Sequence, residues 1–172
     1  MSTTSISLYA ASVPVFKQML GGMATALSKA EAHALAKKID ANALLQARLF
    51  PDMFPLVQQV RIAADFARGV PARLAGMEPP VFEGHEQSFA DLQNLIAKTQ
   101  SFLDGFTAAQ IDGQEGREIV LRPGTPKERK FAGQAYLLAY ALPHFFFHVT
   151  TTYAILRHNG VEIGKADYMG PK

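Results

Sequence analysis

The sequence contains no cysteine among its 172 residues. The chain therefore cannot form disulfides, zinc–thiolate sites or iron–sulfur clusters, and it has no cysteine nucleophile. The motifs Gly-x-Gly-x-x-Gly, Gly-x-x-x-x-Gly-Lys and Gly-x-Ser-x-Gly are absent as well. These absences exclude the common fingerprints of dinucleotide-binding, P-loop and serine-hydrolase proteins.

Charge of one sign and long apolar runs are also scarce. Lys and Arg total 17 against 15 for Asp and Glu, a balance that argues against a nucleic-acid partner bound by charge alone. The most apolar stretch, residues 136–149, is interrupted by Pro143 and His144 and is shorter than the ~20 residues that cross a bilayer. The N-terminal residues lack the basic and apolar segments of a secretory signal. We therefore expect a cytoplasmic protein without a membrane partner.

Apolar residues, in contrast, are plentiful. Hydrophobic residues make up 48% of the chain and charged residues 19%, which is typical of a folded rather than a disordered protein. The length fits a single domain over residues 1–172, and this is enough chain to bury a core without disulfides.

An apolar stripe with alternating spacings of four and three predicts a long helix in the N-terminal third. This helix either follows Ser12 as its cap, with Pro14 in the first turn, or begins near Ser5 and is kinked by Pro14. The pair Gly21-Gly22 suggests the close approach of a neighbouring helix. The stripe consists of Tyr9, Val13, Phe16, Leu20, Met23, Leu27, Ala30 and Ala34.

Capping residues mark the helices that follow. Asp40 is the expected cap of a short helix, and Asp52 that of a second long helix, which Gly76 ends. Ser88 and Asp91 resemble a capping box, with Asp in the place of the usual Glu, and predict a third long helix.

The last third combines a hairpin signal with apolar helical segments. Residues 117–131 are compatible with a small β-hairpin, which must lean on the helices because a lone hairpin is only marginally stable. Pro143 is expected to kink or interrupt a helix that begins near Gln134. A final helix over residues 145–159 ends at Gly160, and the tail, residues 161–172, is expected to be irregular. Four long helices in one domain predict an all-α four-helix bundle, with a small β-hairpin before the last helix.

Five segments carry family-like motifs: Lys29-Ala-Glu-Ala-His33, Arg48-Leu-Phe-Pro-Asp-Met-Phe-Pro-Leu56, Ala72-Arg-Leu-Ala-Gly76, Phe147-His-Val-Thr-Thr-Thr-Tyr153 with Ala154-Ile-Leu-Arg-His-Asn-Gly160, and Gly164-Lys-Ala-Asp-Tyr168. Together they resemble a bacterial family of unknown function that is grouped with the DinB/YfiT-like four-helix bundles. The resemblance covers nearly the whole chain. It implies an up-down-down-up bundle, of a type that is often dimeric in related proteins.

The resemblance also implies a metal site against which the sequence can be compared. The DinB-like superfamily includes proteins assigned as metalloenzymes and thiol transferases, and its usual site has one His on the second bundle helix and two on the fourth. No His lies between His33 and His85, so the second helix offers none. His148 matches the first ligand on the fourth helix, but Thr152, four residues on, is a poor ligand for divalent metals. We therefore expect that the three-His site is lost and that the protein holds no cofactor.

His144 and His148 remain as candidates for a divalent metal because a spacing of four places them on one helix face. A third ligand would have to come from Asp52, Asp65 or Glu31. The alternative, which we favour, is that His144 caps the helix or faces solvent and that His148 is a hydrogen-bonded interior residue.

Polar residues at helical spacing on the second and fourth helices suggest a pocket between them. If both polar stripes face inward, the pocket could bind a small anion or carry out acid–base chemistry. The alternative, which we place ahead for Arg61 and Asp65, is an ordinary surface ion pair. The candidate pocket residues are Gln58, Arg61, Asp65, His148, Thr152 and Tyr153.

Other residues have expected structural roles. Arg48 and Asp52 predict a clamp that fixes the start of the second long helix. Arg157 lies in the expected last turn of the fourth helix, where it would interact favourably with the helix dipole. The three rings of residues 145–147 span about 200° of a helix, so at least one must point away from the core. We expect it to lie in a homodimer interface.

Three functions are compatible with these patterns, and they leave open whether the protein is an enzyme. The first is a DinB-like bundle that has lost its metal and binds a small ligand or a partner between the second and fourth helices. The second is a metal-dependent transferase or hydrolase with a rebuilt site around His148. The third is a dimeric structural or interaction protein without a small-molecule site. We rank the first ahead because the missing ligands count directly against the second.

Overall fold

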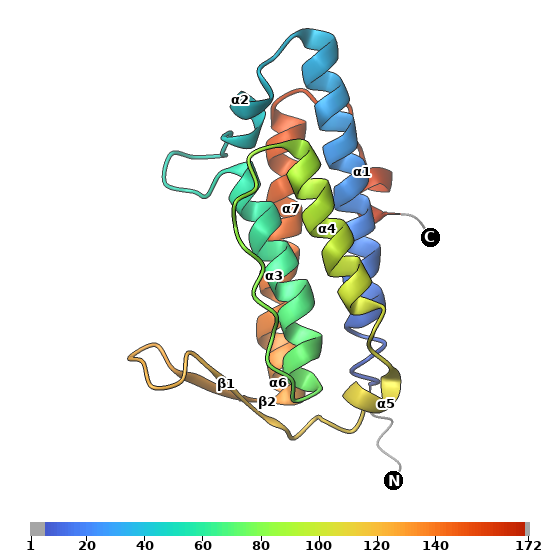
Figure 1. The fold of residues 1–172 in the computed structure, drawn as a ribbon, viewed down its shortest axis with the longest axis vertical. Helices are drawn as coiled ribbons and strands as arrows, with labels where there is room; N and C mark the ends of the chain where they lie inside the picture. Colours follow the sequence, from blue (N-terminus) through green and yellow to red (C-terminus); the bar gives the residue numbers. More distant parts are fainter. Residues whose placement is uncertain (1–5, 171–172) are drawn as a thin grey trace.

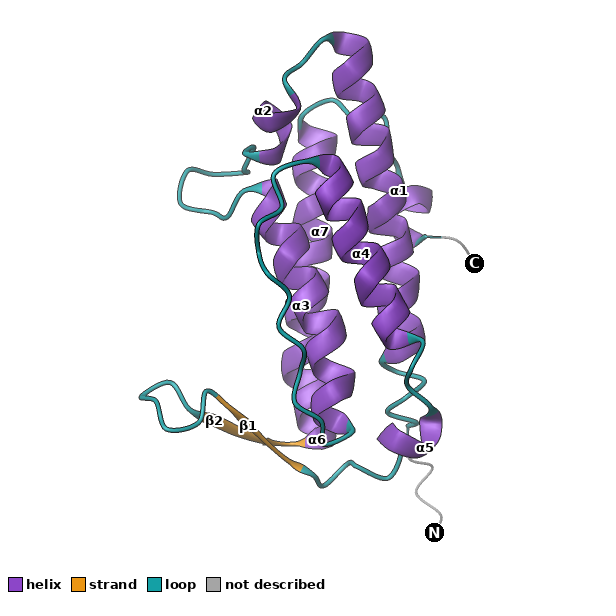
Figure 2. Ribbon diagram, in the orientation of Figure 1, coloured by secondary structure: helices purple, strands orange, loops and turns teal. Residues whose placement is uncertain are grey.

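The computed structural model describes residues 6–170, in which four long helices form an up-down-down-up bundle (Figure 1). The predicted all-α bundle with a small hairpin before the last helix is confirmed, and Figure 2 shows the two short strands beside the helices. The elements in chain order are α1 (Val13–Lys37), α2 (Ala41–Leu45), α3 (Leu56–Leu74), α4 (Phe89–Leu103), α5 (Ala108–Ile111), β1 (Glu118–Leu121), β2 (Arg129–Ala132), α6 (Gly133–Ala135), the π-helical segment η1 (Tyr136–Ala141), α7 (Leu142–His158) and α8 (Lys165–Met169).

The predicted apolar stripe of α1 is confirmed as its buried face. All of its members from Val13 onward lie in the core, and Tyr9 packs against it. The helix begins at Val13 with Pro14 in its first turn, which is the first of the two expected alternatives. Ser12 precedes it but does not cap it, because its hydroxyl donates to the Leu8 carbonyl (2.6 Å) instead of accepting a helix N–H.

The segment between α1 and α3 confirms one predicted cap and corrects another. The Asp40 carboxylate accepts the Asn42 N–H (3.0 Å) at the start of α2, as expected. The prediction that Asp52 caps the second long helix is wrong, because α3 starts only after Pro55. Arg48 forms no clamp with Asp52 either. Its Nη1 donates instead to the carbonyl of Met53 (2.9 Å), so Arg48 holds the turn through the backbone.

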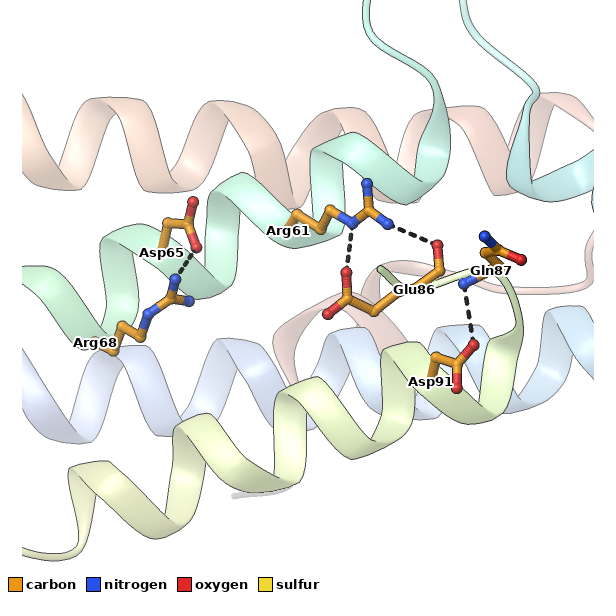
Figure 3. Close-up of polar contacts among 6 residues, drawn as sticks. All are labelled: Arg61, Asp65, Arg68, Glu86, Gln87 and Asp91. Carbon is orange, nitrogen blue, oxygen red and sulfur yellow. Dashed lines mark hydrogen bonds and ion pairs between the residues drawn. The ribbon is translucent and has the colours of Figure 1, made fainter. Parts of the chain in front are cut away.

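A long crossover connects α3 to α4 and lies along the outer side of α3 (Figure 1). We call residues 77–87 the strap. Arg61 of α3 holds its upper part, donating from Nε to the Glu86 carboxylate (2.5 Å) and from Nη2 to the Glu86 carbonyl (2.7 Å) (Figure 3). Arg68 holds its lower part, donating to the Pro80 carbonyl (3.1 Å) and lying over the Phe82 ring (4.4 Å to the centroid). The strap lets α3 and α4 run in the same direction.

The strap ends at the predicted cap of α4. Ser88 Oγ accepts the Asp91 N–H (3.1 Å). The Asp91 carboxylate in turn accepts the Gln87 N–H (3.0 Å) (Figure 3). The hydrogen bond from the Gln87 N–H, with a further contribution from Ser88, lowers the pKa of the Asp91 carboxyl from its ordinary value. The Ser88 cap inferred from the sequence is therefore confirmed, whereas the Asp91 carboxylate accepts the N–H of Gln87 and not, as in a capping box, that of Ser88.

The predicted hairpin is an antiparallel pair in which Ile119 lies opposite Phe131. It crosses the lower end of the bundle, beside the end of α3 (Figure 1). Ile119 is buried in the core, and the Phe131 ring lies 5.1 Å from that of Tyr140 on η1. The hairpin therefore leans on the helices, as its marginal intrinsic stability requires.

Pro143 does not break the last helix. The segment before it, η1, is π-helical and runs directly into α7, which places Pro143 in the first turn of α7. Proline has no N–H to donate within a helix, and the change of hydrogen-bonding pattern at η1 accommodates it without a gap. Gly160, with φ +85°, follows the end of α7 as predicted.

The tail was expected to be irregular, but residues 165–169 form α8, which packs against α1. The Asp167 carboxylate explains this, because it accepts the Gly164 N–H (2.9 Å) and pairs with Lys29 of α1 (2.7 Å). A Cβ at Gly22 would lie 2.6 Å from the Tyr168 carbonyl oxygen, so the close approach predicted at Gly21-Gly22 is that of α8.

The three consecutive phenylalanines diverge as expected. Phe145 is fully buried and packs edge-on against Phe16 (4.7 Å between ring centroids), whereas Phe147 is 55% exposed. The homodimer expected at this ring stays a prediction. Among residues 6–170, no helix is both long and apolar enough to span a bilayer.

Candidate functional site

Four aromatic side chains form a row along η1 and α7. Tyr136, Tyr140, His144 and His148 are each separated by four residues, which places them on one side of the helix. Tyr136 and Tyr140 are stacked with 6.0 Å between ring centroids, and Tyr140 lies 4.2 Å from His144. The row is a continuous polar and aromatic face that points toward α3.

Phe66 is the residue of α3 that meets this row. Its ring stacks on His144 (5.3 Å, interplanar angle 25°) and on His148 (6.3 Å, 21°), and it lies 6.1 Å from Tyr140. Phe66 therefore separates an upper part of the α3–α7 interface, around His148, from a lower part around Tyr140.

The upper part is closed by a hydrogen bond between two buried polar side chains. His148 Nδ1 lies 2.7 Å from Gln59 Oε1, and Gln59 Nε2 donates to the Phe54 carbonyl (3.0 Å). Because the amide donates on one side, its oxygen accepts from His148, which must carry its proton on Nδ1. Burial, with a smaller contribution from His144, lowers the pKa of His148 to about 4. The imidazole is therefore neutral at pH 7, with the lone pair on Nε2.

The two other candidate pocket residues of α7, Thr152 and Tyr153, have different surroundings. Thr152 is buried, and its hydroxyl oxygen has no hydrogen-bond partner among the described residues. Tyr153 lies elsewhere, with its ring edge-on to Tyr168 of α8 (5.8 Å). Tyr153 therefore packs against the C-terminal helix.

The polar residues proposed on α3 face the strap. Gln58, Arg61 and Asp65 line a cavity of about 190 Å³ together with residues of the strap. Asp65 also forms an ion pair with Arg68 (Figure 3). The structure thus divides the six candidate pocket residues among three places: Gln58, Arg61 and Asp65 beneath the strap, His148 and Thr152 on α7 toward α3, and Tyr153 against α8.

The side chains do not fit a metal site with three protein ligands. His144 Nδ1 lies 2.7 Å from the Tyr140 carbonyl, so His144 and His148 each present Nε2 as the free nitrogen. Phe66 and Gln59 stand opposite them on α3. Across residues 6–170, no group of three His, Asp or Glu side chains is placed to hold one ion. Two imidazoles alone would leave at least half of the coordination to exogenous ligands.

The lower part of the interface is open. A cavity of about 210 Å³, which we call the aromatic pocket, lies between α3, η1 and the end of β1. One wall is aromatic, and acidic and basic groups stand at its edge, a combination typical of small-molecule sites. Its lining residues are Asp65, Phe66, Arg73, Leu121, Arg122, Tyr136 and Tyr140.

Two ionisable groups of the aromatic pocket, Tyr136 and Asp65, have pKa values raised by burial. Burial raises the pKa of the Tyr136 hydroxyl, although Arg73 opposes that effect by donating to it from Nη1 (3.4 Å). Burial also raises the pKa of Asp65, against the lowering effect of Arg68. At pH 7 Tyr136 is thus a neutral phenol, and the pocket offers hydrogen-bonding groups beside stacked rings.

A larger hollow, of about 470 Å³, lies between the strap and α4. Its strap residues Val81, Glu83 and His85 are exposed, so it is a surface groove. It also lies away from the α3–α7 interface, and its aromatic lining is limited to Phe82 and the exposed His85. We therefore regard the smaller aromatic pocket as the better candidate.

Several of these residues escaped sequence reasoning. Extending the His144–His148 pair backward by fours would have found Tyr140 and Tyr136. Gln59 was missed in favour of its neighbour Gln58, a difference of one residue or 100° of helix rotation. Arg122 follows a hairpin strand, and no local pattern connects it with α3, which ends at Leu74.

The comparisons with known proteins agree with this architecture. The model of a domain of unknown function, DUF1993, matches residues 8–169. The fold is similar to the crystal structure of a DinB family member protein from Shewanella denitrificans, at 38% identity and a TM-score of 0.90, over 96% of this chain and 93% of the other. No curated protein matches the chain. The resemblance drawn from the sequence motifs is therefore confirmed for family and fold.

Proposed function

Because the chain belongs to the family defined by the domain of unknown function DUF1993, whose name assigns no activity, we propose its function from the geometry of the site: the protein binds a small, planar organic ligand in the aromatic pocket. The observation that carries the proposal is the cavity of about 210 Å³ beside the stacked rings of Tyr136 and Tyr140. A flat ligand can stack on these faces while its polar groups reach the edge of the pocket.

The proposal includes the loss of the three-His metal site. The hydrogen bonds at Nδ1 leave Nε2 of His144 and His148 free, but no third His, Asp or Glu side chain in residues 6–170 is placed to complete a site with them. Metal analysis of protein purified without a His tag tests this part. We expect less than stoichiometric zinc, nickel or iron, whereas a near-stoichiometric ion lost on His148→Ala would favour a metal-dependent transferase or hydrolase.

Binding itself is tested with indole as a neutral planar probe, followed by amide chemical shifts of the labelled protein. We expect shifts concentrated at residues 66, 121, 136 and 140. Tyr140→Leu should weaken indole binding about fivefold or more, because one aromatic wall is lost. Leu138→Ala is the matched control, since Leu138 lies on η1 but is exposed and does not line the pocket. Shifts spread over the surface, or equal affinity in the two variants, would contradict the proposal.

A further inference from the structure

The arginines of the protein differ in whether a carboxylate neutralises them. Arg61 pairs with Glu86 and Arg68 with Asp65. Arg73, Arg117 and Arg122, in contrast, form no ion pair with any carboxylate in residues 6–170. All three line one cavity of about 250 Å³ at the lower end of α3, which we call the arginine cavity. Three uncompensated guanidinium groups on one cavity create a local positive potential.

Two of these guanidinium groups rest where a glycine leaves room for them. A Cβ at Gly69 would lie 2.6 Å from Arg73 Nη1, and a Cβ at Gly76 would lie 2.6 Å from Arg117 Nη1 and 3.0 Å from its Cζ. Arg117 is held further by donation from Nε to Gln114 Oε1 (2.9 Å). Hydrogen bonds restrain both side chains before any ligand binds, Arg117 through Gln114 and Arg73 through the Tyr136 hydroxyl, which lowers the entropy cost of binding.

Arg122 occupies a backbone conformation that favours glycine. Its φ is +52°, in the left-handed region, which costs a side-chain-bearing residue free energy. Strain of this kind is concentrated at functional sites. In Arg122 it places an exposed guanidinium at the border of the two cavities, since Arg122, Arg73 and Leu121 line both.

We propose that the ligand of this protein is an anion carried on a planar ring, with the ring in the aromatic pocket and a phosphate or carboxylate in the arginine cavity, held by Arg73, Arg117 and Arg122. The inference rests on the proposed function and adds the charge of the ligand to it. Each cavity alone is smaller than the ~300–1,000 Å³ of typical small-molecule sites, and a ligand that spans both reaches that range. Guanidinium groups suit both oxyanions because their planar donors match either geometry.

The acidic residues near the arginine cavity do not cancel this charge. Glu78 and Glu118 line it, but neither forms an ion pair with Arg73, Arg117 or Arg122, and the three arginines outnumber them. Asp65 lies at the far side of the aromatic pocket and is already paired with Arg68.

The test compares four probes by calorimetry and amide chemical shifts: phenyl phosphate, benzoate, phenol and inorganic phosphate. We expect phenyl phosphate or benzoate to bind about tenfold or more tightly than phenol and inorganic phosphate, because only the first two carry both a ring and an oxyanion. Comparison of phenyl phosphate with benzoate then identifies which oxyanion the cavity prefers.

Variants connect the binding to the named side chains. Arg73→Ala and Arg122→Gly should each reduce the affinity for the preferred anion about tenfold while leaving phenol unchanged. Arg129→Ala is the matched control, because it removes the same charge from an exposed position on the same hairpin without touching either cavity. Tyr140→Leu should weaken phenyl phosphate but not inorganic phosphate.

The outcomes separate this inference from the proposed function. If phenol binds at the pocket as tightly as the anions, or if Arg129→Ala lowers affinity as much as Arg73→Ala, the anion inference is overturned and the pocket remains. If neither indole nor any of the four probes shifts the residues of either cavity at millimolar concentration, both proposals fail.

Discussion

The interface between α3 and the continuous helix formed by η1 and α7 is closed in its upper part and open in its lower part. In the upper part, Gln59 reaches across to His148 and closes the interface with a buried hydrogen bond of 2.7 Å. In the lower part, Arg73 folds back over Gly69 and Tyr140 leans on Phe131, which leaves a cavity of about 210 Å³. A long polar side chain that finds a partner fills the space, whereas side chains held aside by their own neighbours leave it open.

Because of this difference, substitutions in the upper part should affect folding stability, whereas substitutions in the lower part should mainly affect binding. The buried hydrogen bond of the upper part must be kept intact, because each unsatisfied buried group costs ~1–3 kcal/mol. The groups that line the lower part are half-buried or exposed apart from Tyr136, so most of them can change at little cost to folding. Substitutions in the two parts should therefore have different signatures.

The largest expected effect is the pH dependence that His148 confers on the closed part. In the unfolded chain His148 takes up a proton near pH 6.5, but in the folded protein it does so only near pH 4. The stabilising contribution of the neutral imidazole is complete above pH 6.5 and is lost as the pH falls toward 4. The loss amounts to about 3 kcal/mol of unfolding free energy, measurable by urea unfolding at several pH values.

The variant His148→Gln isolates this contribution from that of the carboxylates. Its unfolding free energy should fall less between pH 6.5 and 4 than that of the natural protein. His158→Gln, at an exposed position of the same helix, should behave like the natural protein. Identical pH profiles for His148→Gln and His158→Gln would show that the folded protein does not exclude the proton from His148.

A smaller loss is expected from Gln59→Ala. The substitution leaves His148 Nδ1 and the Phe54 carbonyl without their partner, and we expect about 2 kcal/mol of destabilisation in urea unfolding at pH 7. Gln58→Ala is the matched control because its side chain lies in the cavity beneath the strap. It should change stability by less than about 0.5 kcal/mol. Equal losses in the two variants would remove the distinction between the α7 and strap sides of α3.

Thr152→Val should have the opposite sign. The Thr152 hydroxyl is buried without a hydrogen-bond partner among the described residues, and valine has the same shape without the polar atom. Removing an unsatisfied polar group should raise the unfolding free energy by about 1 kcal/mol. The adjacent Thr151→Val serves as the comparison, because the Thr151 hydroxyl donates to the Phe147 carbonyl (2.7 Å). A loss of stability in Thr152→Val would indicate a partner such as an ordered water.

The sequence predicts the helices of this fold far better than it predicts the faces they present. The stripe on α1 and the caps at Asp40 and Ser88 are local, because periodicity and capping involve residues a few positions apart. For α3 the pattern of apolar and polar residues does not identify the buried face, because the strap covers a side of the helix that would otherwise be exposed to solvent. Whether Gln58 or Gln59 meets α7 is then decided by tertiary packing. The partners of Arg122 lie across the bundle, so no local pattern could have placed it in a site.

The smallest expected change in stability is that of Arg122→Gly, at the open lower part of the interface. Arg122→Gly removes a side chain from a backbone with φ +52°. The relief of strain exceeds the added freedom of the unfolded chain by a small margin, so we expect a gain of about 0.5 kcal/mol in unfolding free energy. The same variant should lose affinity for a ring-bearing anion, which makes Arg122 a position where stability and binding oppose each other. A thermal shift of the free protein and an anion titration on one sample measure both. Loss of stability with unchanged affinity would mean that Arg122 supports the hairpin and not a ligand.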